Sequence, residues 1–141
     1  MEFSIFSYLV QMVDIKDRED IMKLINSFYT VAKKDNLIGH FFSEVIPLDW
    51  ENHITKIVDF WDHILFHTGN YRGNVMQKHI DLDKLAHLEE IHFDRWQMIW
   101  NRTLNDLYEG PNKEELVKRV EMMKQLMIFK IHKSREDNFI Q

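Results

Sequence analysis

The chain has 141 residues, of which 45% are hydrophobic and 29% are charged, and its formal net charge is −5 at pH 7. This length and balance predict one globular domain rather than a disordered chain, and the acidic net charge argues against nucleic acid as a partner. The absence of cysteine excludes disulfides, thiolate-bound zinc, iron–sulfur clusters and cysteine nucleophiles.

No apolar run approaches the roughly 18 residues that a membrane span requires. Glu2 also stands where a signal peptide carries positive charge. We therefore expect a soluble cytoplasmic protein with no membrane partner.

The chain contains only four glycines and two prolines, which is too few for an all-β domain with many tight turns. It is rich instead in aromatic residues and histidine, with ten Phe, four Trp and eight His. Two interpretations of this excess are open at this point. One is a pocket for a flat apolar cofactor, and the other is a Phe-rich core with surface histidines. Composition alone favours the second interpretation.

The first half of the chain predicts an N-terminal extension and two helices. Residues 1–16 lack a strong helix cap and are taken as the extension. Asp17 is placed to cap a helix near 17–35, with acidic residues in its first turn and apolar residues at helical spacing. The connector that follows is unusually apolar for a loop, so we expect Phe41 and Phe42 to pack inward.

The next predicted helix, near 49–67, has Asp49 as its N-cap and a wide apolar arc, and we expect Gly69 to end it. Residues 69–74 form the clearest loop in the chain, and a short helical piece with Met76 to Leu82 follows.

The last third of the chain predicts two long helices. The first lies near 88–109 and ends at Gly110-Pro111. The second lies near 112–132, where Asn112 and Glu115 resemble a capping box. Residues 133–141 form a polar tail that we expect to fray.

Two histidine patterns could hold a metal, and neither is complete. His63 and His67 lie at i, i+4 on one helix face, but Ile64 occupies the place of the catalytic glutamate in a zinc H-E-x-x-H motif and no third ligand is evident. Glu89 and His92 form a single E-x-x-H, whereas a di-iron bundle needs that motif on two helices. Surface histidines are the ordinary alternative for both.

A haem protein needs one neutral imidazole, an apolar slot and cations or donors near the propionates. His79 lies on the short helical piece, with Arg72 and Lys78 close in sequence. Spacing alone does not distinguish His79 from His53 or His63 as the iron ligand.

A resemblance to a known family separates these candidates. The run YRGNVMQKHIDL, residues 71–82, resembles the proximal segment of group III truncated haemoglobins. The run HFDRW, residues 92–96, together with Trp100, resembles the helix that follows in that family. Further patches fall in the family's order at Phe28-Tyr29, at Ile38-Gly39-His40-Phe41-Phe42, and at His53 with Phe60-Trp61.

The resemblance covers about residues 20–130 and has two departures. Val75 stands where the family often has proline, which bears on the rigidity of the preceding loop. The N-terminal extension has no counterpart with a known role.

The resemblance implies an all-α fold, the truncated globin, in which two antiparallel helix pairs form a two-on-two helical sandwich around haem b within residues 17–132. His79 would be the proximal iron ligand, and Tyr29, His53 and Trp96 would bind the ligand on the distal side. The pocket wall would consist of Phe28, Phe42, Ile57, Phe60 and Trp61, with Arg72 and Lys78 as partners of the propionates.

Each of these polar roles has an ordinary structural alternative. Tyr29 and Trp96 fit core positions, His53 fits a position turned to solvent, and Arg72 and Lys78 fit solvated loop charges.

The resemblance further implies a haem protein that reversibly binds dioxygen and other diatomic gases, with no catalytic residue of its own. Several hydrogen-bond donors predict slow release, so a haem enzyme with nitric oxide dioxygenase or peroxidase-like activity and an external reductase is an alternative. A cofactor-free helical interaction protein is the second alternative. We expect a monomer or a weak homo-oligomer.

Overall fold

The computed structural model describes residues 12–45 and 49–140, so residues 1–11 of the expected extension and 46–48 of the connector lie outside it. The described residues form helices and loops without a strand, which confirms the predicted all-α class. In chain order the elements are α2 (Arg18–Ala32), a π-helical turn η1 (Phe41–Val45), α3 (Trp50–Phe66), α4 (Val75–Leu85), α5 (Glu90–Leu107) and α6 (Pro111–Ile140).

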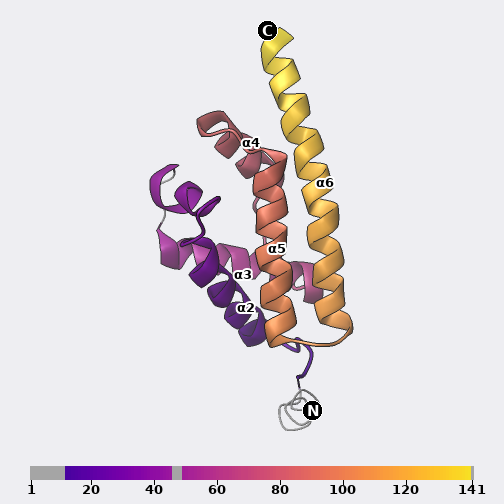
Figure 1. The fold of residues 1–141 in the computed structure, drawn as a ribbon. Coiled ribbons are helices and arrows are strands. Elements are labelled where there is room, and N and C mark those ends of the chain that lie inside the picture. Colours follow the sequence, from indigo (N-terminus) through magenta and orange to yellow (C-terminus); the bar gives the residue numbers. More distant parts are fainter. Residues whose placement is uncertain (1–11, 46–48, 141) are drawn as a thin grey trace.

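Two layers of helices enclose the core (Figure 1). Helix α2 packs against α3 and α5, α5 lies alongside α6, and α3 crosses behind them to reach α6. The shorter α4 lies against the C-terminal half of α6. At the start of α2, Arg18 donates hydrogen bonds to Asp59 (2.6 Å) and Asp62 (3.3 Å) of α3, which ties the two helices together.

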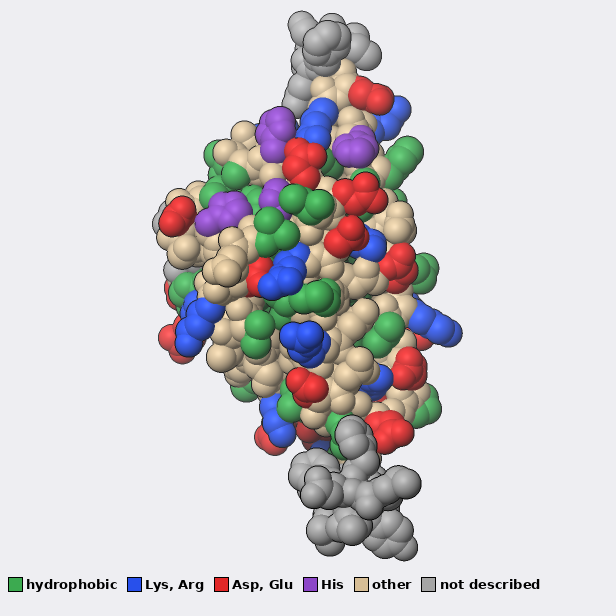
Figure 2. All heavy atoms as spheres, in the orientation of Figure 1, with side chains coloured by type: hydrophobic (Ala, Val, Ile, Leu, Met, Phe, Trp, Pro, Cys, Tyr) green, Lys and Arg blue, Asp and Glu red, His purple; other side chains and the backbone are tan. Residues whose placement is uncertain are grey.

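Unlike the apolar core, the surface carries side chains of several types. Acidic, basic and apolar side chains are mixed over the face drawn in Figure 2. Lys124 of α6, for example, pairs with the exposed Asp94 of α5 at 3.1 Å. Ion pairs in which one partner is exposed to solvent contribute at most about 1 kcal/mol each, and apolar residues of α5 and α6 such as Trp100 and Leu116 lie in the core.

The predicted N-caps of the first two helices are confirmed. Asp17 accepts a hydrogen bond from the backbone N–H of Asp20 at 3.0 Å, and Asp49 accepts one from Asn52 at 3.4 Å. Asn74 caps α4 in the same way through Gln77, at 3.0 Å.

The end of α3 differs from the prediction. The residue in the left-handed conformation is His67, with φ of 56°, and the helix ends one residue before it. The Nδ1 atom of His63 accepts a hydrogen bond from the N–H of Gly69 at 3.0 Å, so a side chain rather than glycine alone terminates this helix.

The start of α6 also differs, because its cap comes from the other end of the chain. Asp14 accepts hydrogen bonds from the N–H groups of Asn112 (2.8 Å) and Lys113 (2.9 Å). Gly110 has φ of 143°, and any side chain there would collide with Asp14. The predicted Asn112–Glu115 capping box is wrong, since the amide of Asn112 donates to the Ile15 carbonyl oxygen and Glu115 accepts from Arg119.

Contacts cross both of the expected domain boundaries. Ile15, placed in the extension from sequence, is 1% exposed and belongs to the core. Helix α6 continues to Ile140, so the expected fraying after His132 is wrong for residues 133–140, and Arg135 binds Asp83 of α4.

None of the described helices is both long enough and apolar enough to cross a membrane.

Loss of the Asp14 cap is the first testable consequence. Asp14→Ala leaves two N–H groups at the start of α6 without an acceptor, so we expect the free energy of unfolding to fall by about 1–2 kcal/mol. Urea denaturation followed by circular dichroism measures this change. The control is Asp106→Ala on the exposed end of α5, which should change stability by less than about 0.5 kcal/mol. Equal effects of the two substitutions would contradict the capping role.

Candidate functional site

The ring of His79 is held in one tautomer by the backbone of its own helix. Its Nδ1 lies 2.8 Å from the carbonyl oxygen of Val75, one turn earlier in α4. A carbonyl can only accept, so Nδ1 carries the proton and Nε2 keeps its lone pair for another partner. Burial lowers the pKa of His79, which keeps the ring neutral near pH 7.

Val75, where the family often has proline, is the first residue of α4. The first N–H of a helix has no intrahelical acceptor, so proline and valine are both tolerated there. The carbonyl that accepts from His79 is present with either residue, and this departure leaves the His79 contact intact.

Tyr29 and His53 form a polar pair between α2 and α3. The hydroxyl of Tyr29 lies 3.2 Å from Nε2 of His53. Burial raises the pKa of Tyr29 and lowers the pKa of His53, where the positive charge of Lys78 adds to the effect. Both side chains are therefore neutral near pH 7, and one of them donates to the other.

Two small cavities meet at the same three side chains. One has a volume of about 60 Å³ and the other about 100 Å³. Tyr29 of α2, His79 of α4 and Trp96 of α5 line both of them. The first cavity is otherwise mainly aromatic and aliphatic and includes the predicted wall residues Phe28, Ile57, Phe60 and Trp61, and the second includes Phe42.

The remaining predicted residues lie outside these cavities. His53 reaches them only through its contact with Tyr29. Arg72, in the loop before α4, and Lys78, in the first turns of α4, are both exposed to solvent. The structure thus brings together eight of the candidate residues around the cavities and leaves the two cations at the surface.

These residues fit a haem in their chemistry, since one half-buried, neutral imidazole faces apolar and aromatic walls. The cavities themselves are smaller than the roughly 300–1,000 Å³ of most ligand sites. The side chains that line them must move apart to admit a macrocycle.

The wall of the second cavity is anchored by a buried carboxylate. Asp35 accepts hydrogen bonds from the N–H groups of Leu37 (3.0 Å) and Ile38 (3.1 Å) and from Nε of Arg95 on α5 (2.8 Å). This holds the segment that follows, in which Phe41 is buried and Phe42 meets the ring of Tyr29 edge-on at 5.4 Å. Both phenylalanines pack inward, as the sequence predicts.

Two aromatic residues near the site were not singled out from the sequence. Trp50 contacts Tyr29, His53 and Phe42, with ring centroids 5.5, 5.6 and 6.1 Å apart. The ring of Phe93 lies 6.5 Å from that of His79. Both lie on regular apolar stripes, which indicate burial but not what the buried side chain touches.

The other histidine patterns have structural partners. His63 caps α3, and Nδ1 of His92 accepts from the N–H of Glu89 at 2.9 Å at the start of α5. Within the part of the chain that the structure describes, no three His, Asp or Glu side chains lie together as a metal site.

Comparison with known proteins identifies the class. No protein-family model matches the chain. The crystal structure of a group III truncated haemoglobin from Campylobacter jejuni matches with a TM-score of 0.75 and 27% identity, over 86% of this chain and 95% of that one. The fold is therefore the truncated globin, as predicted, and the protein is of the globin type that binds haem.

The curated group 3 truncated haemoglobin ctb of Campylobacter jejuni is 30% identical over 110 residues, which cover 76% of this chain and 84% of that protein. The chain belongs to the group III truncated haemoglobin family.

The Asp35 anchor generates a second prediction. Burial would raise the pKa of Asp35, but hydrogen bonds from Arg95 and from the Ile38 and Leu37 N–H groups together hold it below its usual range. A carboxyl with a lowered folded pKa stabilises the fold above its unfolded pKa of about 3.9, and this contribution disappears as the pH falls through the folded pKa.

We therefore expect Asp35→Asn to lower the free energy of unfolding by about 1–2 kcal/mol at pH 7, and the difference from wild type to shrink below about pH 4. Denaturant titrations at several pH values measure it. A difference that stays constant down to pH 2 would contradict a charged role for Asp35.

Proposed function

We propose that this protein binds haem b through His79 and reversibly binds dioxygen and other diatomic gases at a polar distal site. The observation that supports this most directly is the His79 ring, which is half-buried, neutral and fixed through Nδ1 so that Nε2 is available. Membership of the truncated haemoglobin family supports it independently.

Bound haem supplies an iron that coordinates diatomic gases. His79 would hold that iron, and Phe28, Phe42, Ile57, Phe60 and Trp61 would surround the macrocycle and exclude water. Arg72 and Lys78, which are exposed, would reach the propionates at the surface.

Tyr29, His53 and Trp96 would form the distal side. When Nε2 of His53 carries the proton, it donates to the hydroxyl oxygen of Tyr29, and the hydroxyl proton is free to turn toward the cavity. The indole N–H of Trp96 is a second donor on a side chain that lines both cavities. Such donors stabilise a polarised ligand such as dioxygen and favour slow release.

The same donors favour a second candidate function, a haem enzyme with nitric oxide dioxygenase or peroxidase-like activity. Turnover would require an external reductase. Consumption of nitric oxide by the reconstituted protein with a flavin reductase, at rates above those of free haem, supports this second function. Rates equal to those of free haem leave gas binding as the function.

The proximal role of His79 is tested by substitution. We expect His79→Ala to lower haem affinity by more than about 100-fold, since changes even to the neighbours of a metal ligand cost about 10–100-fold. The melting temperature measured with haem should fall as well, because a ligand of the folded state stabilises it. Soret absorbance and thermal melts give both values.

The control is His132→Ala on the exposed face of α6, which should leave the Soret band unchanged. A wild-type Soret band in the His79→Ala variant would remove His79 as ligand, and a wild-type protein without Soret absorbance after reconstitution would leave the cofactor-free interpretation.

The distal donors are tested by comparing two gases. Tyr29→Phe removes only a hydroxyl, and Trp96→Phe removes the indole N–H. We expect each to raise the dioxygen dissociation rate by roughly three- to thirtyfold, which corresponds to the loss of about 0.7–2 kcal/mol per donor. Carbon monoxide, which is less polarised, should change less, and stopped-flow kinetics measures both gases.

His53 can replace the lost donor in the Tyr29→Phe variant, since it already lies beside the hydroxyl. The double variant Tyr29→Phe/His53→Leu should then release dioxygen faster than the two single effects predict. Equal changes for the two gases in all variants would mean that these residues act through packing.

A further inference from the structure

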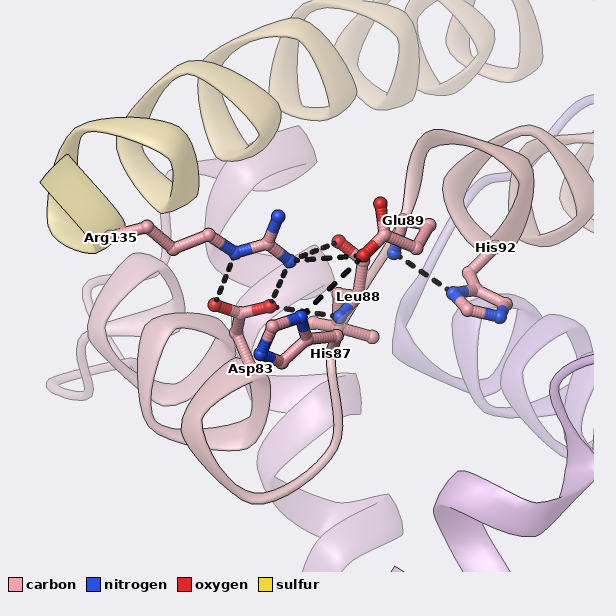
Figure 3. A network of polar contacts seen from close by, with 6 residues as sticks. All are labelled: Asp83, His87, Leu88, Glu89, His92 and Arg135. Atoms are coloured by element: carbon pink, nitrogen blue, oxygen red, sulfur yellow. Dashed lines mark hydrogen bonds and ion pairs between the residues drawn. The ribbon is translucent and has the colours of Figure 1, made fainter.

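The helix that carries His79 is joined to α6 by an ion pair between the buried Asp83 and the half-buried Arg135. Nη2 of Arg135 donates to Oδ1 of Asp83 at 2.6 Å, and Nε of the same guanidinium donates to Oδ2 at 3.1 Å (Figure 3). The Asp83 side chain is only 5% exposed. Two parallel hydrogen bonds between arginine and carboxylate give both strength and a defined direction.

The same two side chains also hold the turn between α4 and α5. Oδ1 of Asp83 accepts from the N–H of Leu88 at 2.9 Å, and Nη2 of Arg135 donates to the Leu88 carbonyl oxygen at 3.2 Å. Glu89 lies 3.4 Å from Nη2 of Arg135 and is drawn beside it in Figure 3. Arg135 therefore contacts the end of α4 and the start of α5 together.

Apart from this pair, helix α4 is held by partly buried apolar side chains. Its 11 residues are fewer than the roughly 12–15 that an isolated helix needs, so its placement depends on tertiary contacts. Asp83 is the one residue of α4 that is buried, whereas the apolar residues of the helix are half-buried or, in the case of Leu85, exposed. The helix packs chiefly against α6, where Arg135 lies.

The position of Asp83 connects this contact to His79. Asp83 comes four residues after His79, so the two lie one turn apart on the same face of α4. Burial would raise the pKa of Asp83, yet the hydrogen bonds from Arg135 and the Leu88 N–H hold it below its usual range, so the carboxylate is charged in the folded protein.

We propose that Arg135 is a positioning residue for His79, acting through Asp83 to fix α4 on α6 and thereby the distance and orientation of the imidazole relative to the distal side chains. This inference rests on the proposed function of His79. It assigns a role to the segment after His132, which the sequence presents as a polar tail.

The test compares Arg135→Gln with a matched control on the same helix. Arg119→Gln also removes an arginine–carboxylate pair, to Glu115 within α6, without touching α4. Arg135→Lys keeps the charge but not the paired geometry, and should give an intermediate result. The double variant Asp83→Asn/Arg135→Gln avoids an unpaired buried charge and provides a folded protein if Arg135→Gln alone is unstable.

The first measurement uses the protein without haem. Hydrogen–deuterium exchange should become faster in the α4 amides of the Arg135→Gln and double variants, while protection of α2 and of the middle of α5 stays at the wild-type level. The Arg119→Gln variant should exchange like wild type throughout.

The second set of measurements uses the haem-loaded protein. We expect the rate of haem transfer to an excess of an apo-globin acceptor to rise about tenfold in Arg135→Gln, equivalent to about 1.4 kcal/mol. The iron–histidine stretching band in the resonance Raman spectrum should shift or broaden, which a general loss of stability would not produce.

Two results would overturn the proposal. Wild-type haem transfer and Raman bands in the Arg135→Gln and double variants would show that the pair does not position His79. Faster exchange spread evenly over all helices would show a general structural role. Failure of the wild-type protein to bind haem would refute the proposed function instead, and the exchange data without haem would still show whether Arg135 holds α4.

Discussion

A histidine binds a metal through a ring nitrogen that carries no proton, and in this protein the geometry of His79 leaves Nε2 in that state. The hydrogen bond from Nδ1 to the Val75 carbonyl oxygen fixes the ring, and burial keeps it neutral. Helix α4 has polar contacts at its two ends, the Asn74 cap and the Asp83–Arg135 pair, and its partly buried apolar side chains pack against the core. Charged and polar groups outside the two cavities thus take part in holding the helix that carries His79.

Opposite α4, the Tyr29–His53 pair lies on helices that the apolar core holds in place. Trp61 of α3 stacks on Trp100 of α5 with centroids 4.7 Å apart, and Phe28 of α2 meets Trp100 edge-on. Tyr29, the next residue along α2, is thereby directed to the two cavities. Since these cavities are small and closely lined, binding of a macrocycle and packing of the core are coupled.

Local features of the chain were predictable because their partners are close in sequence. Asp17 and Asp49 cap helices whose free N–H groups lie three residues later, and the apolar spacing after them marks α2 and α3. The cap of α6 could not be predicted, because Asp14 lies 98 residues before Asn112 and no local pattern joins them. The left-handed His67 was missed for a related reason, since the side chain of His63 takes part of the role that glycine usually fills.

By itself the sequence determined the helical class and, through five ordered patches, the family. It identified His79 as the ligand candidate only through that resemblance, since His53 and His63 satisfy the same spacing. The tertiary structure decided which polar side chains contact one another or line the same cavities. It paired Tyr29 with His53, brought Trp96 and His79 to the same cavities, and buried Asp83 against Arg135. Asp83 and Arg135 are 52 positions apart in the sequence. Helical periodicity shows which residues of one helix share a face, but it does not show which residue of another helix they contact. The pairing of these two side chains depends on how α4 and α6 pack.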